Sequence, residues 1–231
     1  MTDTISRAHL PPTHTHATMD YFPLFCDLKG KRCLIVGGGQ VATHKARGLL
    51  QAGATLRLVA PSITSELEQL CAEHDIEWLP VPLLKQHLTG CWLAIAATND
   101  AAANRQVSQW ATAEQKFCNC VDDPSCASFI TPAIIDCSPV IIAVSCGGHA
   151  PVYSKILKQH LSEQLPAGMR EMVLLAGVLR ERVNQSCDIR ERKRAFWTMF
   201  FHHAPLRQAV SENNTDEIHQ QVESLFQNAL F

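Results

Sequence analysis

The chain has 231 residues, of which 46% are hydrophobic and 18% are charged, and its formal net charge is −2. That length suits one large domain, or a medium domain with a smaller companion. The near-neutral charge gives no electrostatic reason to expect a nucleic-acid or membrane-surface partner, because both favour a basic excess. No apolar run approaches the roughly 20 residues that cross a bilayer. The composition therefore predicts an ordinary globular protein.

Residues 1–18 are polar, contain Pro11-Pro12, and lack the apolar core of a secretory signal. We predict that they form a disordered tail, and that the protein is cytoplasmic. Whether translation begins at Met1 or at Met19 stays open.

Ten cysteines are many for a chain without a secretory signal. In a reducing cytoplasm disulfides are rare, and buried cysteine behaves as a small hydrophobic residue. The closest group, Cys118, Cys120 and Cys126, has no CxxC pair and no histidines at ligand spacing. We therefore expect packing roles for the cysteines, and no bound metal.

Strand-like and helical runs alternate from residue 31 onward. Strands are predicted at 32–36, 55–59, 76–79, 92–96 and 117–121, with helices at 40–51, 63–73 and about 98–113. Strands separated by such helices predict a parallel, doubly wound α/β sheet of the Rossmann type.

After Pro132 the periodicity changes. A strand is predicted at 140–145 and a helix at 151–165, followed by helical runs at 169–184, 189–201 and 216–226. The predicted organisation is a tail (1–18), a Rossmann domain (19–131), a small mixed α/β segment (132–165) and a helical domain (166–231).

A glycine motif, Gly37-x-Gly39-x-x-Ala42, joins the first strand to the first helix. The first glycine allows a tight turn, the second lets the backbone approach a pyrophosphate, and the small third residue lets the helix pack closely. The helix N-terminus adds free N–H groups and a partial positive charge. A turn that binds nothing is the alternative, but the strand before and the helix after favour dinucleotide binding.

The second strand ends without the acidic residue that usually grips the ribose of NAD. The sequence there is Leu58-Val59-Ala60-Pro61-Ser62, so Ser62 and backbone groups would have to serve instead. Arg57 could favour the 2′-phosphate of NADP, or could point away from it. The residues alone leave the choice between NAD and NADP open.

Asn119-Cys120-Val121-Asp122-Asp123-Pro124 follows the fifth strand, at the edge where open α/β sheets gather ligands. A carboxylate there can act as a general base or attract a metal cation. Adjacent side chains project in different directions, so at most one of Asp122 and Asp123 faces a cleft. Simple turn chemistry is an equally supported interpretation.

Two further segments could carry function. In Ser145-Cys146-Gly147-Gly148-His149-Ala150-Pro151 the backbone could hold an anion, and His149 could be a ligand or an acid, although most lone histidines have no such role. The basic run at 180–194 could bind an anionic substrate, but its interspersed glutamates favour a solvated helix face.

Together these residues resemble the siroheme-synthase dehydrogenase/ferrochelatase family, from about Met19 to the C-terminus. The stretches that carry the resemblance are Met19-Asp-Tyr-Phe-Pro-Leu-Phe, Cys33-Leu-Ile-Val-Gly-Gly-Gly-Gln-Val-Ala, Lys45-Ala-Arg, Trp92-Leu-Ala-Ile-Ala-Ala-Thr, Cys118-Asn, Val121-Asp122, Ala127-Ser-Phe-Ile and Gly147-Gly148-His-Ala-Pro151.

The resemblance implies NAD-dependent oxidation of precorrin-2 to sirohydrochlorin, followed by insertion of ferrous iron to give siroheme. It also implies a homodimer in which segment 132–165 interlocks two subunits. No methyltransferase domain follows, so that activity of the larger enzymes is not expected. Two alternatives stay open, namely a dehydrogenase without chelatase activity and a non-catalytic, dinucleotide-sensing module.

The resemblance also implies roles for single residues. Asp122 matches the central catalytic aspartate, and Asn119, Ser128 and His149 are expected to bind substrate. Cys146 stands where some relatives carry a serine that can be phosphorylated, so that regulation is not carried over. Iron is a substrate, and no metal-ligand set is expected. The residues expected to bind NAD are Gly37, Gly39, Gln40, Val41, Pro61, Ser62, Thr98 and Asn99.

Overall fold

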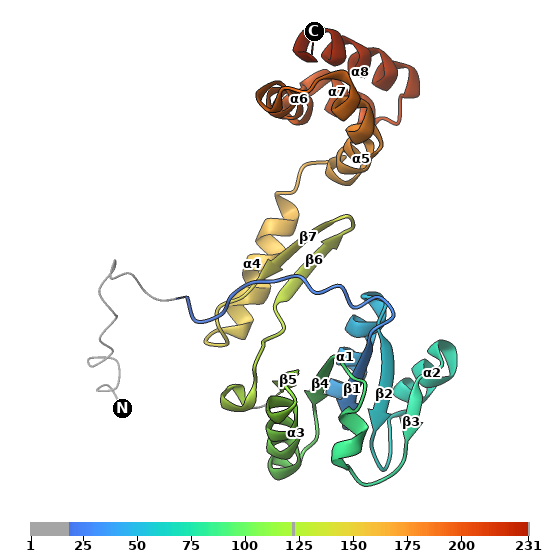
Figure 1. Ribbon diagram of the computed structural model, residues 1–231, viewed down its shortest axis with the longest axis vertical. Coiled ribbons are helices and arrows are strands. Elements are labelled where there is room, and N and C mark those ends of the chain that lie inside the picture. The colour runs from blue at the N-terminus through green and yellow to red at the C-terminus, as the bar shows by residue number, and fades with distance from the viewer. Residues whose placement is uncertain (1–18, 122, 231) are drawn as a thin grey trace, which may run out of the picture. The chain divides into compact units, whose positions relative to one another are not determined.

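The computed structural model describes residues 19–121 and 123–230 (Figure 1). The chain divides into two compact units, one ending at Thr131 and the other beginning at Pro132. The tail predicted at residues 1–18 and the predicted base Asp122 lie outside the described residues.

The first unit contains a five-stranded parallel sheet in the order β3-β2-β1-β4-β5. The predicted doubly wound α/β fold is confirmed. The order reverses between β1 and β4, which is where such sheets form their ligand crevice. The elements are β1 (Arg32–Val36), α1 (Gln40–Gln51), β2 (Thr55–Val59), α2 (Ser65–His74), β3 (Glu77–Leu79), the short 3₁₀ helix η1 (Lys85–Leu88), β4 (Leu93–Ala96), α3 (Ala101–Ala113), β5 (Phe117–Cys120) and the 3₁₀ helix η2 (Pro124–Cys126).

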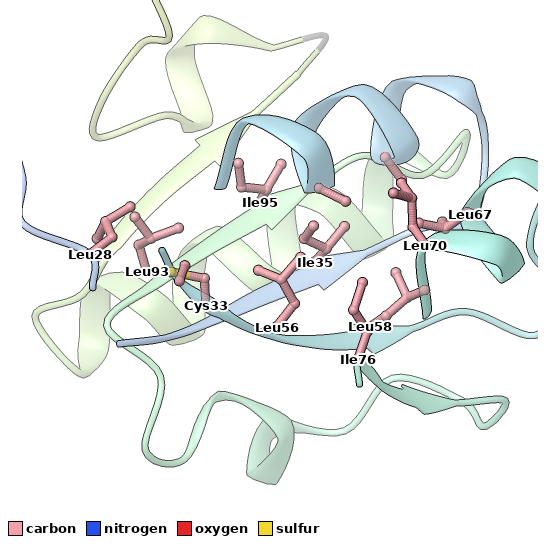
Figure 2. Packing of buried hydrophobic residues seen from close by; sticks show 13 residues of the cluster. Leu28, Cys33, Ile35, Leu56, Leu58, Leu67, Leu70, Ile76, Leu93 and Ile95 are labelled. Atoms are coloured by element: carbon pink, nitrogen blue, oxygen red, sulfur yellow. The ribbon is translucent and has the colours of Figure 1, made fainter. Parts of the chain in front are cut away.

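The sheet is buried on both faces, which explains its continuous apolar strands. In β1, Cys33 and Ile35 belong to the cluster that includes α1, and Leu34 and Val36 belong to the cluster that includes α3. Figure 2 shows the first cluster. Small residues on α1 let that helix lie close to the strands. Burying one isoleucine such as Ile35 contributes about 1.5–3 kcal/mol.

The second unit begins with an antiparallel hairpin and continues as helices. Its helices α5 to α8 enclose a core around Phe196 and Phe200, both fully buried. The elements are β6 (Ala133–Cys137), β7 (Val140–Val144), α4 (Pro151–Glu163), α5 (Met169–Ser186), α6 (Arg190–His202), α7 (Ala204–Ser211) and α8 (Thr215–Leu230).

Two elements of the second unit were not predicted. β6 is a five-residue strand that starts next to Pro132 and contains Asp136, so its apolar run is too short to stand out. α7 is separated from α6 by a single residue, His203, whose Nδ1 accepts a hydrogen bond from the backbone N–H of Leu206. Pro205 lies in the first turn of α7, where its missing N–H costs nothing.

The hairpin and α4 keep large apolar side chains exposed. α4 packs on the hairpin, yet Ile134 and Ile141 remain 43% and 45% exposed. On α4, Val152, Tyr153 and Ile156 are each more than half exposed. Exposed apolar surface on neighbouring elements often marks an interaction site. Across the described ranges, no helix is both long and apolar enough to span a membrane.

Candidate functional site

The glycine turn after β1 is packed tightly against two neighbouring loops. Gly37 has φ +121°, a conformation that favours glycine, and a Cβ on it would lie 2.3 Å from the carbonyl oxygen of Ala97. A Cβ on Gly38 would lie 2.0 Å from the carbonyl oxygen of Ser62. The protein's own backbone therefore requires both glycines.

Gly39 differs from its two neighbours. A Cβ built on Gly39 would meet nothing within 4 Å, and its φ of −87° is open to any residue. It also precedes α1 without a side-chain cap, which leaves N–H groups of the first turn available for an anion. Neither strain nor packing accounts for glycine here, whereas a closely approaching pyrophosphate does. The turn therefore fits a dinucleotide.

A cleft of about 590 Å³ opens beside this turn, at the carboxyl ends of β1, β2 and β4. This volume lies within the usual range for ligand sites. Gln40 and Val41 do not line the cleft, and both are exposed. The expected cofactor residues that the structure brings together in its wall are Gly37, Gly39, Pro61, Ser62, Thr98 and Asn99.

Sequence reasoning missed the wall formed by Val81, Pro82 and Leu83, which follow β3. These side chains give the cleft an apolar side, suited to a flat aromatic base. The available signal was their position after a strand, because the carboxyl ends of parallel strands share one edge of the sheet.

The turn after β4 is held by Asn104, which is buried on α3. Its Oδ1 accepts hydrogen bonds from the backbone N–H of Thr98 (3.2 Å) and from Thr98 Oγ1 (2.7 Å). Its Nδ2 donates to the carbonyl oxygen of Thr98 (2.9 Å). This network fixes Thr98 in the wall of the cleft before any ligand arrives.

Charged groups are nearly absent from the cleft. Among the described residues that line it, none is Lys or Arg, and the single carboxylate is Asp100. Asp100 caps α3 by accepting from the N–H groups of Ala102 and Ala103. Arg57 is committed elsewhere, because its Nε donates to Glu77 Oε2 (2.8 Å) and its Nη1 to the carbonyl oxygen of His87 (3.0 Å).

Asn119, near the end of β5, has an unused acceptor. Its side chain is buried, and its Nδ2 donates to the carbonyl oxygen of Phe129 (2.9 Å). Its Oδ1 is the one buried side-chain N or O atom without a hydrogen-bond partner in the described part of the chain. An unsatisfied buried acceptor is costly, so this oxygen points to a ligand that donates a hydrogen bond.

Ser128, also expected to bind substrate, is bonded to the backbone of β5. Its Oγ accepts from the N–H of Cys118 (2.7 Å) and donates to the carbonyl oxygen of Cys118 (3.3 Å). Its own N–H donates to that same carbonyl (2.8 Å). These bonds hold residues 128–131, here called the strap, alongside β5.

Asp123 is a turn residue. Its Oδ1 accepts from the backbone N–H (3.1 Å) and from Oγ (2.5 Å) of Ser125, and its Oδ2 accepts from Cys126 Sγ (3.3 Å). The hydrogen bonds from Ser125, then that from Cys126, lower the pKa of Asp123. A carboxylate with a lowered pKa is a weak base. Asp123 therefore stabilises the turn, as the turn interpretation of the sequence predicted.

His149 belongs to the second unit, where it is exposed. It follows Gly147 (φ +62°) and Gly148 (φ +84°), two positions whose left-handed backbone favours glycine. Among residues 19–121 and 123–230, no three His, Cys, Asp or Glu side chains come together in a way that could hold a metal ion.

All ten cysteines are free thiols. Burial, with a smaller effect of neighbouring thiols, raises the pKa of Cys33 and of Cys118 to about 12. These two thiols are core residues with little thiolate at neutral pH.

Two family models match the chain in succession. The first, described as "Putative NAD(P)-binding", covers residues 24–133. The second, "Sirohaem synthase dimerisation region", covers residues 169–226, which lie after the segment 132–165 that we expected to mediate the dimer. The first unit is accordingly an NAD(P)-binding domain.

Curated relatives share the siroheme synthase name. The chain is 44% identical over 208 residues to siroheme synthase 3 of Aeromonas hydrophila. It is 41% identical to siroheme synthase 2 of Yersinia enterocolitica and 42% identical to the siroheme synthase of Edwardsiella ictaluri. Each match covers 90% of this chain but only 44–45% of the relative, so the chain spans less than half of their length.

A solved structure, named SirC, precorrin-2 dehydrogenase, has the same fold. It aligns with a TM-score of 0.69 at 23% identity, over 88% of this chain and 100% of that one. With two consecutive family models, and with 41–44% identity to siroheme synthases over 90% of its length, the chain belongs to the siroheme synthase family.

Proposed function

We propose that this chain oxidises precorrin-2 to sirohydrochlorin with NAD as the hydride acceptor, and then inserts ferrous iron to give siroheme. The observation that carries the proposal is Gly39, a glycine that the protein's own packing does not require. It lies at the carboxyl edge of the sheet, as does the unused acceptor of Asn119.

The cleft favours NAD over NADP. A 2′-phosphate is usually recognised by a nearby basic side chain. The described lining of the cleft offers none, and Arg57 is bonded to Glu77 and to backbone carbonyls. Ser62 and the backbone around Pro61 remain to bind the ribose.

The proposed oxidation removes one hydride and one proton from the macrocycle. When bound, NAD supplies the hydride acceptor. The proton requires a base, and Asp123 is occupied by Ser125 and Cys126. Asp122, to which the family resemblance assigns this role, is the proposed base. Asn119 Oδ1 suits a pyrrole N–H, because it is a buried acceptor with no donor.

We propose that iron enters as a substrate, at an open site and not in a tight cage of protein ligands. For the assembly we propose a homodimer, since the exposed apolar faces of the hairpin and α4 would be covered by a second copy. We also propose a cytoplasmic location, because a reducing compartment maintains free thiols such as these ten.

The test is turnover of precorrin-2 by the purified chain, followed by absorbance, with NAD and with NADP. Asp122→Asn should lower kcat by about a hundredfold or more, the usual effect of removing a general base. The matched control Asp123→Asn should retain most of the activity. Equal activity of Asp122→Asn and wild type would remove Asp122 as the base.

Iron insertion needs a separate assay. Purified sirohydrochlorin is incubated with Fe²⁺ or Co²⁺ and the chain, and metal insertion is compared with the uncatalysed rate. Insertion no faster than that rate would leave a dehydrogenase alone. Binding of NAD without any change in precorrin-2 absorbance would instead indicate a dinucleotide-sensing module.

A further inference from the structure

Lys45 lies on the face of α1 that packs on the sheet. Ala42, three residues before it, is fully buried, and Leu49, four residues after it, packs against the same core cluster. Residues three or four positions apart share one face of a helix. Lys45 is itself half-buried, an unusual position for a lysine.

The ammonium group of Lys45 has few partners. Its Nζ donates to Thr131 Oγ1 at 2.9 Å. In the described part of the chain it forms no ion pair, and burial lowers its pKa. An ammonium has three N–H donors, so two remain after the bond to Thr131. A partly buried cation without a counter-charge is costly, which suggests that an anion binds there.

The strap links Lys45 to Asn119. The carbonyl oxygen of Phe129 accepts a hydrogen bond from the side-chain amide of Asn119. Two residues later, Oγ1 of Thr131 accepts a hydrogen bond from the Lys45 ammonium. Two residues of extended chain span about 7 Å. One segment therefore holds a cation with free donors and an amide oxygen with no donor.

These two groups complement a tetrapyrrole. Its ring N–H groups are donors for an oxygen such as Asn119 Oδ1, and the carboxylates at its rim are anions for an ammonium. Resting on the function proposed above, we propose that Lys45 binds a rim carboxylate of the tetrapyrrole substrate and so determines how the macrocycle is oriented. The competing interpretation is that Lys45 only fastens the strap through Thr131.

Three variants separate these interpretations. Lys45→Met removes the charge and the bond to Thr131, Lys45→Arg keeps a cation, and Thr131→Val removes the bond but keeps the ammonium. The matched control is Lys116→Met, because Lys116 is another partly buried lysine, whose Nζ donates to the carbonyl oxygens of Leu88 and Cys91. Each variant is first checked for an unchanged thermal unfolding midpoint and an unchanged KM for NAD.

With precorrin-2 as the varied substrate, Lys45→Met should raise KM about tenfold to a hundredfold, the effect of one lost charge-assisted hydrogen bond. Its kcat should stay within about twofold of wild type, as expected for a binding group. Lys45→Arg should recover most of the KM, and both Thr131→Val and Lys116→Met should keep it near wild type. If Thr131→Val raises KM as much as Lys45→Met does, Lys45 only fastens the strap.

Failure of this inference can be distinguished from failure of the proposed function. Wild-type turnover together with an unchanged KM in Lys45→Met overturns the role of Lys45 alone. Absence of wild-type turnover overturns the proposed function. In that case absorbance titration with sirohydrochlorin tests Lys45 directly, and equal dissociation constants for wild type and Lys45→Met overturn its role.

Discussion

β1 and β7 are both five-residue apolar strands, Arg-Cys-Leu-Ile-Val and Val-Ile-Ile-Ala-Val, but their surroundings differ completely. β1 lies between two parallel neighbours with helices on both faces, and all its residues except Arg32 are buried. β7 has one partner strand and α4 on one face, and none of its residues is fully buried.

An apolar strand sequence indicates that the segment must be buried. It does not indicate which part of the molecule, or which partner, buries it. The first unit supplies the cover for β1 from its own chain. The hairpin leaves Ile134 and Ile141 uncovered, so its stability is expected to depend on association. Three predictions test this contrast, from the largest expected effect to the smallest.

Thiol reactivity should separate the buried sheet of the first unit from the second unit most strongly. Cys118 in the first unit has a pKa of about 12, against an ordinary value of 9.0, so it carries about a thousandfold less thiolate than an unperturbed thiol. The three cysteines of the second unit, Cys137, Cys146 and Cys187, are all partly exposed. Iodoacetamide labelling with mass spectrometry should modify these three long before Cys33 and Cys118. Early labelling of Cys118 in native protein would contradict its place in the core.

Truncating one isoleucine in each unit should have the second-largest effect. Ile35→Ala removes a side chain that is 1% exposed, and should lower the free energy of unfolding by about 3 kcal/mol. Ile141→Ala, on the open face of the hairpin, should lower it by less than about 1 kcal/mol in dilute protein, and should weaken self-association. Urea unfolding by circular dichroism and sedimentation at several concentrations measure both effects. An equal loss of stability in the two variants would mean that the hairpin face is covered within one chain.

The smallest effect should lie within the glycine turn. Gly38→Ala places a Cβ against the carbonyl of Ser62, and should destabilise the first unit by about 2 kcal/mol. Gly39→Ala should leave stability within about 0.5 kcal/mol of wild type, because nothing lies near its Cβ, yet should weaken NAD binding. Thermal unfolding with and without NAD checks both variants. A stability loss in Gly39→Ala would show that this glycine serves packing.

The sequence predicted the first unit closely, because its signals are local. The apolar run 32–36 followed by glycines matches β1, and the helix predicted at 40–51 matches α1. β6 was missed because a short strand is defined by its partner, and the partner pairs across a turn that periodicity does not reveal. α7 was missed because eight residues beside a longer helix carry little periodic signal of their own.

In the candidate site, too, the local features were predicted and the contacts between distant segments were not. The glycine turn was found from spacing, since its parts are neighbours in sequence. The wall at residues 81–83 and the bond between Lys45 and Thr131, which are 86 positions apart, arise only when distant segments meet. The turn role of Asp123 was also left open by the sequence, because it depends on the hydrogen bonds from Ser125 and Cys126. The role of Asp122 itself stays a prediction.

The bonds between Ser128 and Cys118 have a consequence for solubility. β5 is an edge strand, and the outward N–H and C=O groups of an edge strand are a template on which another chain can pair and start aggregation. Ser128 forms hydrogen bonds to both the backbone N–H and the C=O of Cys118. The opposite edge, β3, is only three residues long. Each border of the sheet thus offers few free N–H and C=O groups for unwanted strand addition.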